Sequence, residues 1–156
     1  GLDASCYHVS PLELSGGQKR SVAIAGVLAM NPSILILDEP AAGLDPYTKR
    51  QVFDLILKIQ KKRNLAVVLV SHHMEDVAVY ANRVWVMHQG ELVLQGSPIE
   101  IFSQTERLKE MNIGVPQITS VTEKLIRNGL PLERVAVSVD DAENMILQML
   151  NRRKAR

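Results

Sequence analysis

Two carboxylates and a histidine follow two separate apolar runs of the chain. Asp38 and Glu39 come directly after residues 34–37, and His72 follows residues 65–70 with one serine between. An aspartate of this kind suits Mg²⁺, held through water, because Mg²⁺ prefers oxygen ligands. A neighbouring glutamate can act as a general base toward water, and an imidazole can donate a hydrogen bond to phosphate. The three residues therefore predict hydrolysis of a phosphate ester or anhydride.

A glycine-containing turn precedes the first of these runs. Leu14 to Gln18 read Leu-Ser-Gly-Gly-Gln and stand before a stretch with helical periodicity. Ser15 can cap that helix, and the glycines allow backbone N–H groups to approach an anion at its N-terminus. Alone, a Ser-Gly-Gly turn is more often only a turn. In a chain that also carries the carboxylates, the turn formed by Ser15, Gly16, Gly17 and Gln18 has a geometry that suits phosphate binding.

The elements that must position these residues form a β-α-β pattern. The runs at 34–37 and 65–70 are apolar on both alternating faces, which is typical of parallel strands buried on both sides. Between them, residues 52–59 carry apolar side chains at helical spacing, and Asp45-Pro46 supplies an N-cap followed by proline. We expect an α/β fold whose strands bring their carboxyl ends to one edge, where ligands of such sheets bind.

The second half of the chain predicts a hairpin and several helices. Residues 83–88 and 91–95 flank Gln89-Gly90, and we expect this hairpin to form an antiparallel edge of the same sheet. Ser97 to Glu100 has capping-box spacing, which predicts a short helix through Phe102 or Ser103.

The sequence pattern changes near residue 105, from alternating strands and helices to short helices, which predicts a domain boundary. Short helices are expected near 121–127 and 139–153, after proline and glycine breaks. We interpret residues 1–104 as one α/β piece and residues 105–156 as a small, mainly helical extension with dimerisation as its candidate role.

Bulk properties exclude several classes of protein. The 156 residues carry a formal charge of +1, so no strong field favours nucleic acid or an anionic membrane. The longest uncharged apolar stretch, residues 22–30, is far below the roughly 20 residues that a membrane-spanning helix needs. Cys6 is the only cysteine, which excludes an intramolecular disulfide and fits a reducing cytoplasm.

Four ordered motifs resemble those of ABC ATPases. Residues 14–18, 34–40, 43–45 and 71–72 are similar to the signature, Walker B, D-loop and H-loop of that family. Strand alternation alone leaves His72 and His73 open, whereas the resemblance implies that His72 is the switch histidine. It also implies that Asp45 belongs to the loop linking two ATPase subunits, and that the signature residues contact the ATP held by the partner.

Further segments resemble the ATPases of energy-coupling-factor importers, namely residues 11–13, 19–30, 112–117 and 129–132. The resemblance implies ATP and Mg²⁺ as cofactors and a P-loop NTPase fold. It further implies a second ATPase subunit, a transmembrane coupling protein and a substrate-binding membrane protein as partners, with no nucleic acid. We expect a peripheral subunit on the cytoplasmic face of the membrane that powers uptake of vitamins or transition-metal ions such as cobalt. The transported substrate, and whether the ATPase pair is homo- or heterodimeric, stay open.

Departures from the family pattern concern three positions and one motif. Ser21 replaces a usual arginine, Ala41 a common threonine and His73 a common aspartate, and none of these changes removes a catalytic group. No Gly-x-x-x-x-Gly-Lys-Ser/Thr motif occurs in the 156 residues. We therefore expect a carboxyl-terminal portion that neither binds ATP tightly nor hydrolyses it when alone.

Two other classes of protein share part of this pattern. Chromosome-maintenance and repair ATPases of the same superfamily also carry these motifs apart from Walker A, but they continue from a long coiled coil, and no heptad run precedes the signature. A stand-alone regulatory or dimerisation module would not need to retain Glu39 and His72. The sequence upstream of Gly1 would separate the three classes.

Overall fold

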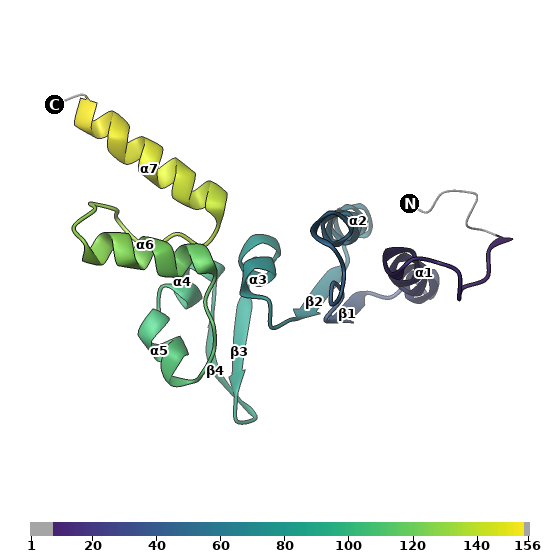
Figure 1. Cartoon of the computed structure of the whole chain (residues 1–156). Coiled ribbons are helices and arrows are strands. Elements are labelled where there is room, and N and C mark those ends of the chain that lie inside the picture. Colours follow the sequence, from purple (N-terminus) through teal and green to yellow (C-terminus); the bar gives the residue numbers. More distant parts are fainter. Residues whose placement is uncertain (1–7, 155–156) are drawn as a thin grey trace. The chain divides into compact units, whose positions relative to one another are not determined.

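The computed structural model describes residues 8–154, and side chains through residue 152 (Figure 1). The chain divides into two compact units, Gly1–His72 and His73–Arg156. We call them the amino-terminal unit and the carboxyl-terminal unit. The boundary expected at residues 104 and 105 concerns a functional division and stays a prediction. Cys6 and the last two residues of the basic tail lie outside the described residues.

The amino-terminal unit contains a parallel β-α-β unit. Its elements are α1 (Gly16–Ala29), β1 (Ile34–Asp38), α2 (Pro46–Arg63) and β2 (Ala66–Val70). β1 and β2 pair in parallel, with Ile34 opposite Ala66 and Asp38 opposite Val70. The predicted cap at Asp45 and the proline in the first helical turn are confirmed. The carboxyl ends of both strands therefore meet at one edge, as expected.

The parallel strands are covered on one face only, within the residues that the structure describes. Leu35 and Leu37 are buried, whereas Ile36 keeps 67 % of its surface exposed. On β2, Val68 and Val70 are exposed as well. The prediction that these strands are buried on both sides is therefore wrong for this chain, because its own helices supply cover for one face.

The carboxyl-terminal unit combines a hairpin with five helices among its described residues. Its elements are α3 (Met74–Tyr80), β3 (Val84–His88), β4 (Glu91–Gly96), α4 (Pro98–Phe102), α5 (Thr105–Glu110), α6 (Gln117–Arg127) and α7 (Val139–Lys154). Gln89 and Gly90 both have positive φ, which suits a tight turn between right-twisted strands. The predicted hairpin is confirmed, but it forms a two-stranded sheet of its own. Its expected place at the edge of the parallel sheet concerns the other unit and stays a prediction.

One hydrophobic core joins the hairpin to the helices of this unit. Its buried members come from β3, β4, α4, α5 and the segment before α7: Val84, Val86, Leu94, Ile101, Phe102, Leu108 and Val137. The core therefore includes side chains from both sides of residue 105. The predicted capping box of α4 is confirmed, with Ser97 and Glu100 as its members.

Two buried threonines and one partly buried ion pair of the carboxyl-terminal unit are hydrogen-bonded. The Thr119 hydroxyl donates to the Ala136 carbonyl at 2.7 Å, and the Ala136 N–H donates to the Thr122 hydroxyl at 3.0 Å. Arg134 makes a bidentate pair with Asp141 at the start of α7, at 2.7 and 2.6 Å. Such pairing removes the cost of burying these groups. In the described part of the chain, no helix combines the length and apolar character needed to cross a bilayer.

Candidate functional site

Glu39 stands at a sharp backbone turn where β1 ends. Its φ is +44°, in the left-handed region that non-glycine residues rarely adopt. The Glu39 N–H donates to the Val70 carbonyl at 2.9 Å, so the turn begins while the chain is still held to β2. The Glu39 carbonyl accepts from the Ala42 N–H at 3.2 Å and from Arg20 Nη2 at 3.4 Å. The backbone of this residue is thus fixed on both sides.

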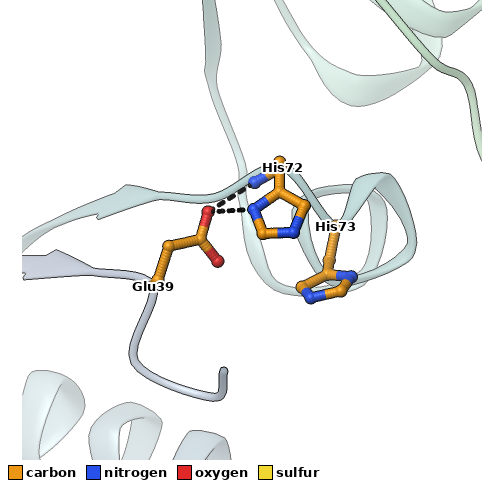
Figure 2. A group of neighbouring side chains, drawn as sticks. All are labelled: Glu39, His72 and His73. Carbon is orange, nitrogen blue, oxygen red and sulfur yellow. Dashed lines mark hydrogen bonds and ion pairs between the residues drawn. The ribbon is translucent and has the colours of Figure 1, made fainter. Parts of the chain in front are cut away.

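The carboxylate of Glu39 faces the end of β2 (Figure 2). Its Oε1 accepts from the His72 backbone N–H at 2.8 Å and lies 2.6 Å from His72 Nδ1. Its Oε2 accepts from the Ser71 hydroxyl at 3.4 Å. The Glu39 side chain is 29 % exposed and the His72 side chain 73 % exposed. The expected proximity of Glu39 and His72 is confirmed, whereas their roles stay predictions.

The short contact to Nδ1 bears on the tautomer of His72. When Glu39 is ionised it can only accept, and Nδ1 then carries the hydrogen between the two atoms. In the neutral ring with that tautomer, Nε2 is an acceptor. His72 can donate from Nε2 to a phosphate oxygen while keeping Glu39 only as the imidazolium, in which both nitrogens carry hydrogen.

Asp38 is the last residue of β1, and its side chain is exposed beside Glu39. An accessible carboxylate at this edge offers the oxygen ligand that Mg²⁺ prefers. The residue type and its place therefore fit the expected role, with water completing the coordination.

The turn before α1 is a complete capping box. The Ser15 hydroxyl accepts from the Gln18 N–H at 3.3 Å, and the Ser15 N–H donates to Gln18 Oε1 at 2.8 Å. Ser15 and Gly16 are exposed, whereas Gly17 is buried. Ser15 therefore caps the helix as predicted. Gln18, which the sequence assigns to the ligand, serves the cap in this structure.

The chain is similar to known proteins over most of its length. A family model described as "ABC transporter" matches residues 2–42. The "Energy-coupling factor transporter ATP-binding protein EcfA2" of Caldanaerobacter subterraneus subsp. tengcongensis is 46 % identical over 150 residues, which are 96 % of this chain and 52 % of that protein. The chain belongs to the energy-coupling-factor ATP-binding proteins. It spans about half the length of the curated relatives it matches.

Solved structures place this energy-coupling-factor chain among ATP-binding cassettes. The structure of cbiO1 from Clostridium perfringens, described as part of the ABC transporter complex cbiONQ, is 41 % identical with a TM-score of 0.58. The match covers 72 % of this chain and 45 % of that one. The dimeric MJ0796 cassette bound to ADP and Pi is 31 % identical with a TM-score of 0.55, covering 62 % and 41 % of the two chains. The fold is that of an ABC ATPase.

The two signature glycines of this energy-coupling-factor chain differ in their surroundings. A Cβ added at Gly16 would lie 3.6 Å from Leu44 Cδ2, an ordinary contact. A Cβ added at Gly17 would lie 2.2 Å from Thr48 Cγ2, closer than two non-bonded carbon atoms can approach. A larger residue at position 17 would therefore force the Thr48 side chain to move, and sequence motifs give no sign of this contact.

Asp45 of the D-loop caps α2 with both carboxylate oxygens. Oδ1 accepts from the N–H groups of Tyr47 and Thr48, each at 3.0 Å, and Oδ2 accepts from the Thr48 hydroxyl at 2.5 Å. The Thr48 hydroxyl, with these backbone donors, holds the pKa of the Asp45 carboxyl below its usual value. Asp45 thus stays ionised while it remains exposed.

Arg20 and Ser21 lie on the signature helix, and sequence reasoning assigned only Ser21. Ser21 stands where the family usually has arginine, and its hydroxyl donates to the Gly17 carbonyl of the same helix at 3.0 Å. Arg20 instead reaches the Glu39 carbonyl. Of the other departures, Ala41 is buried, and His73 is the N-cap residue of α3. The contact of Arg20 with the Glu39 carbonyl could not be predicted from the sequence, because a single arginine near the start of a helix is common.

Proposed function

We propose that this chain is the carboxyl-terminal portion of the ATP-hydrolysing subunit of an energy-coupling-factor importer for vitamins or transition-metal ions. The observation that carries the proposal is the arrangement of Glu39 and His72 at the carboxyl edge of the parallel strands, where ligands of such folds bind. The relatives named as energy-coupling-factor ATP-binding proteins support the same conclusion.

In the proposed reaction, Glu39 orients a water molecule for in-line attack on the terminal phosphate and accepts its proton. His72 donates from Nε2 to the phosphate oxygen while Nδ1 keeps Glu39 in place. Asp38 holds Mg²⁺ through water, and the ion supplies neutralisation of phosphate charge. The half-buried Glu39 side chain is accessible to water yet restrained by His72 and Ser71.

The site is proposed to be completed by a second ATPase subunit. Ser15 and Gly16 are exposed at the N-terminus of α1, where backbone N–H groups and the helix dipole favour an anion. The related MJ0796 cassette is described as a dimer bound to ADP and Pi, which supports pairing. We propose that the paired subunits join a transmembrane coupling protein and a substrate-binding membrane protein at the cytoplasmic face of the membrane.

The test is a glutamine substitution of Glu39 in the full-length, paired ATPase. We expect Glu39→Gln to lower Mg²⁺-dependent ATP hydrolysis by about 100-fold or more, because the proton acceptor is lost while the shape is kept. ATP binding, followed with a fluorescent nucleotide, should persist. Glu110→Gln on α5 is the matched control, since Glu110 is an exposed glutamate outside the proposed site.

Hydrolysis by Glu39→Gln within about threefold of the unmodified protein would reject Glu39 as the base. The chain of residues 1–156 alone is proposed to lack turnover, because it has no P-loop motif. Mg²⁺-dependent hydrolysis by that purified chain, above a Glu39→Gln control prepared identically, would overturn this second statement.

A further inference from the structure

The side chain of Thr48 contacts two segments that the proposed function uses separately. Its methyl group occupies the space beside signature residue Gly17, and its hydroxyl donates to D-loop residue Asp45. We propose that Thr48 is a positioning residue that fixes the signature turn and the D-loop relative to each other. This inference rests on the proposed function, because the two segments are there expected to face the partner ATPase.

The methyl side of Thr48 explains why residue 17 is glycine. Thr48 Cγ2 lies 2.2 Å from the place of a Gly17 Cβ, whereas Thr48 Cβ itself lies 3.7 Å away. The close approach is therefore made by one methyl group. Gly17 is buried and Thr48 is half-buried, so the contact lies within the packed surface between α1 and α2. Any side chain at residue 17 would displace the Thr48 methyl group, either by rotating the Thr48 side chain away from its bond to Asp45 or by moving the first turn of α2.

The hydroxyl side of Thr48 restrains the D-loop carboxylate. The 2.5 Å bond from Thr48 Oγ1 fixes Asp45 Oδ2, while backbone N–H groups fix Oδ1. Both oxygens are therefore held in one orientation, although the carboxylate is exposed. A hydrogen bond to a charged group is among the stronger ones in proteins.

A second contact joins the same two segments. Leu44 of the D-loop lies at ordinary packing distance from the place of a Gly16 Cβ, at 3.6 Å. Both signature glycines are therefore lined by residues of the D-loop and the first turn of α2. Thr48 adds a hydrogen bond to this packing, because its side chain contacts one segment through carbon and the other through oxygen.

The methyl contact is tested by allele-specific rescue in the full-length, paired ATPase. We expect Gly17→Ala to lower kcat roughly tenfold and to lower the melting temperature, because the new methyl group overlaps Thr48 Cγ2. Adding Thr48→Ser removes Cγ2 and should restore most of both losses. Adding Thr48→Val keeps a methyl group and should restore neither.

Gly26→Ala is the matched control on the same helix. A Cβ at Gly26 would meet nothing within 4 Å, so this substitution should leave kcat unchanged and should not lower the melting temperature. If Gly17→Ala combined with Thr48→Ser is as impaired as Gly17→Ala alone, the methyl contact is rejected. That outcome would leave the close approach of its backbone to the nucleotide as the reason for glycine at residue 17.

The hydroxyl contact is tested by comparing two single substitutions. We expect Thr48→Val to lower kcat roughly tenfold with little change in the KM for ATP, because ATP docks on the P-loop rather than on the D-loop. Thr48→Ser keeps the hydroxyl and should retain kcat within about twofold. A Thr48→Val enzyme with unchanged kcat, or with an altered KM alone, would overturn the positioning role.

Failure of the proposed function gives a different result. If the unmodified paired protein does not hydrolyse Mg²⁺-ATP, the proposed function fails, and the melting temperatures of the Gly17 and Thr48 variants still decide whether the contact exists. If the unmodified protein is active and the rescue is absent, the inference about Thr48 alone fails.

Discussion

The two units of the chain differ in how completely they bury their apolar side chains. In the carboxyl-terminal unit, β3, β4, α4 and α5 enclose Leu108 so fully that none of its surface is exposed. In the amino-terminal unit, β1 and β2 are covered on one face, and their other face presents Ile36 and Val70. The unit that carries the proposed chemistry is thus the one whose sheet is less complete in the described residues.

The open strand face of the amino-terminal unit agrees with the fact that the curated relatives are longer than this chain. The chain spans about half of the curated proteins that it matches, and contiguous exposed apolar patches mark surfaces that contact other protein. The open face of β1 and β2 therefore has the character of a contact surface, whereas the core of the carboxyl-terminal unit is supplied by its own elements. Four experiments on the 156-residue chain test this contrast.

The largest effect is expected from truncation in the enclosed core. Leu108→Ala should lower the free energy of unfolding of the carboxyl-terminal unit by about 2–5 kcal/mol, because it leaves a cavity among packed side chains. Trp85 lies on β3 of that unit and is the only tryptophan of the chain. Urea unfolding followed by its fluorescence measures the change. A loss below about 1 kcal/mol would show that this core is loosely packed.

A smaller effect is expected from the bidentate pair at the start of α7. A double-mutant cycle of Arg134→Met and Asp141→Asn should give a coupling free energy of about 1 kcal/mol, because the geometry is bidentate but the guanidinium is partly exposed. The same tryptophan fluorescence reports each variant. The exposed pair of Glu133 and Arg152 is the matched control, and its coupling should be weaker. Equal couplings would contradict the role assigned to partial burial.

The same pair predicts a dependence of stability on pH. The Arg134 guanidinium, together with the Val137 N–H, holds the pKa of Asp141 below its ordinary value of 3.8. The folded protein therefore binds this proton less readily than the unfolded chain. Its stabilisation is complete above the ordinary pKa and is lost as the pH falls through the folded value.

Unfolding free energies measured from about pH 5 downward should therefore decrease, and Asp141→Asn should flatten part of that decrease. An identical pH dependence in Asp141→Asn would assign the effect to other carboxylates. Glu123 is one such group, since the Thr105 hydroxyl and Lys109 lower its pKa.

The smallest effect is expected on the open strand face. Ile36→Thr in the chain of 156 residues should change the free energy of unfolding of β1 and β2 by less than about 0.5 kcal/mol, because the side chain is mostly exposed. Amide hydrogen exchange of the two strands measures it. Leu35→Ala on the buried face is the matched control and should cost about 2–4 kcal/mol. A large cost for Ile36→Thr would show that this face is covered, and a concentration dependence would identify self-association as the cause.

Local sequence signals predicted the elements that position the site. Ser97 with Glu100, Asp45 with Pro46 and Gln89-Gly90 each specify a cap or turn through their own backbone chemistry, and each is confirmed. The parallel pairing of β1 and β2 follows from the helix between them, which then brings Glu39 to His72. Spacing along the chain is sufficient for such features, because the interacting groups are close in sequence or fixed by strand pairing.

Features that depend on packing between elements could not be predicted. The sequence of an apolar strand does not show which element covers each of its faces. Burial on both faces was therefore expected for β1 and β2, although one face is open. The hairpin pattern likewise does not specify which sheet it joins. The contact of Thr48 with Gly17 arises where α1 and α2 meet, and no periodicity relates a threonine to a glycine on another helix.

At Glu39, the backbone conformation and the proposed chemistry favour different residue types. At φ +44°, glycine or asparagine would be conformationally easier, and a glutamate costs of order 1 kcal/mol or more. A chain selected only for stability has no reason to keep glutamate here, whereas a chain in which Glu39 acts as the proposed base must keep it. The residue at this turn therefore tests that proposal. In a family member whose ATPase site has decayed, this position is where glycine or asparagine should first replace the carboxylate.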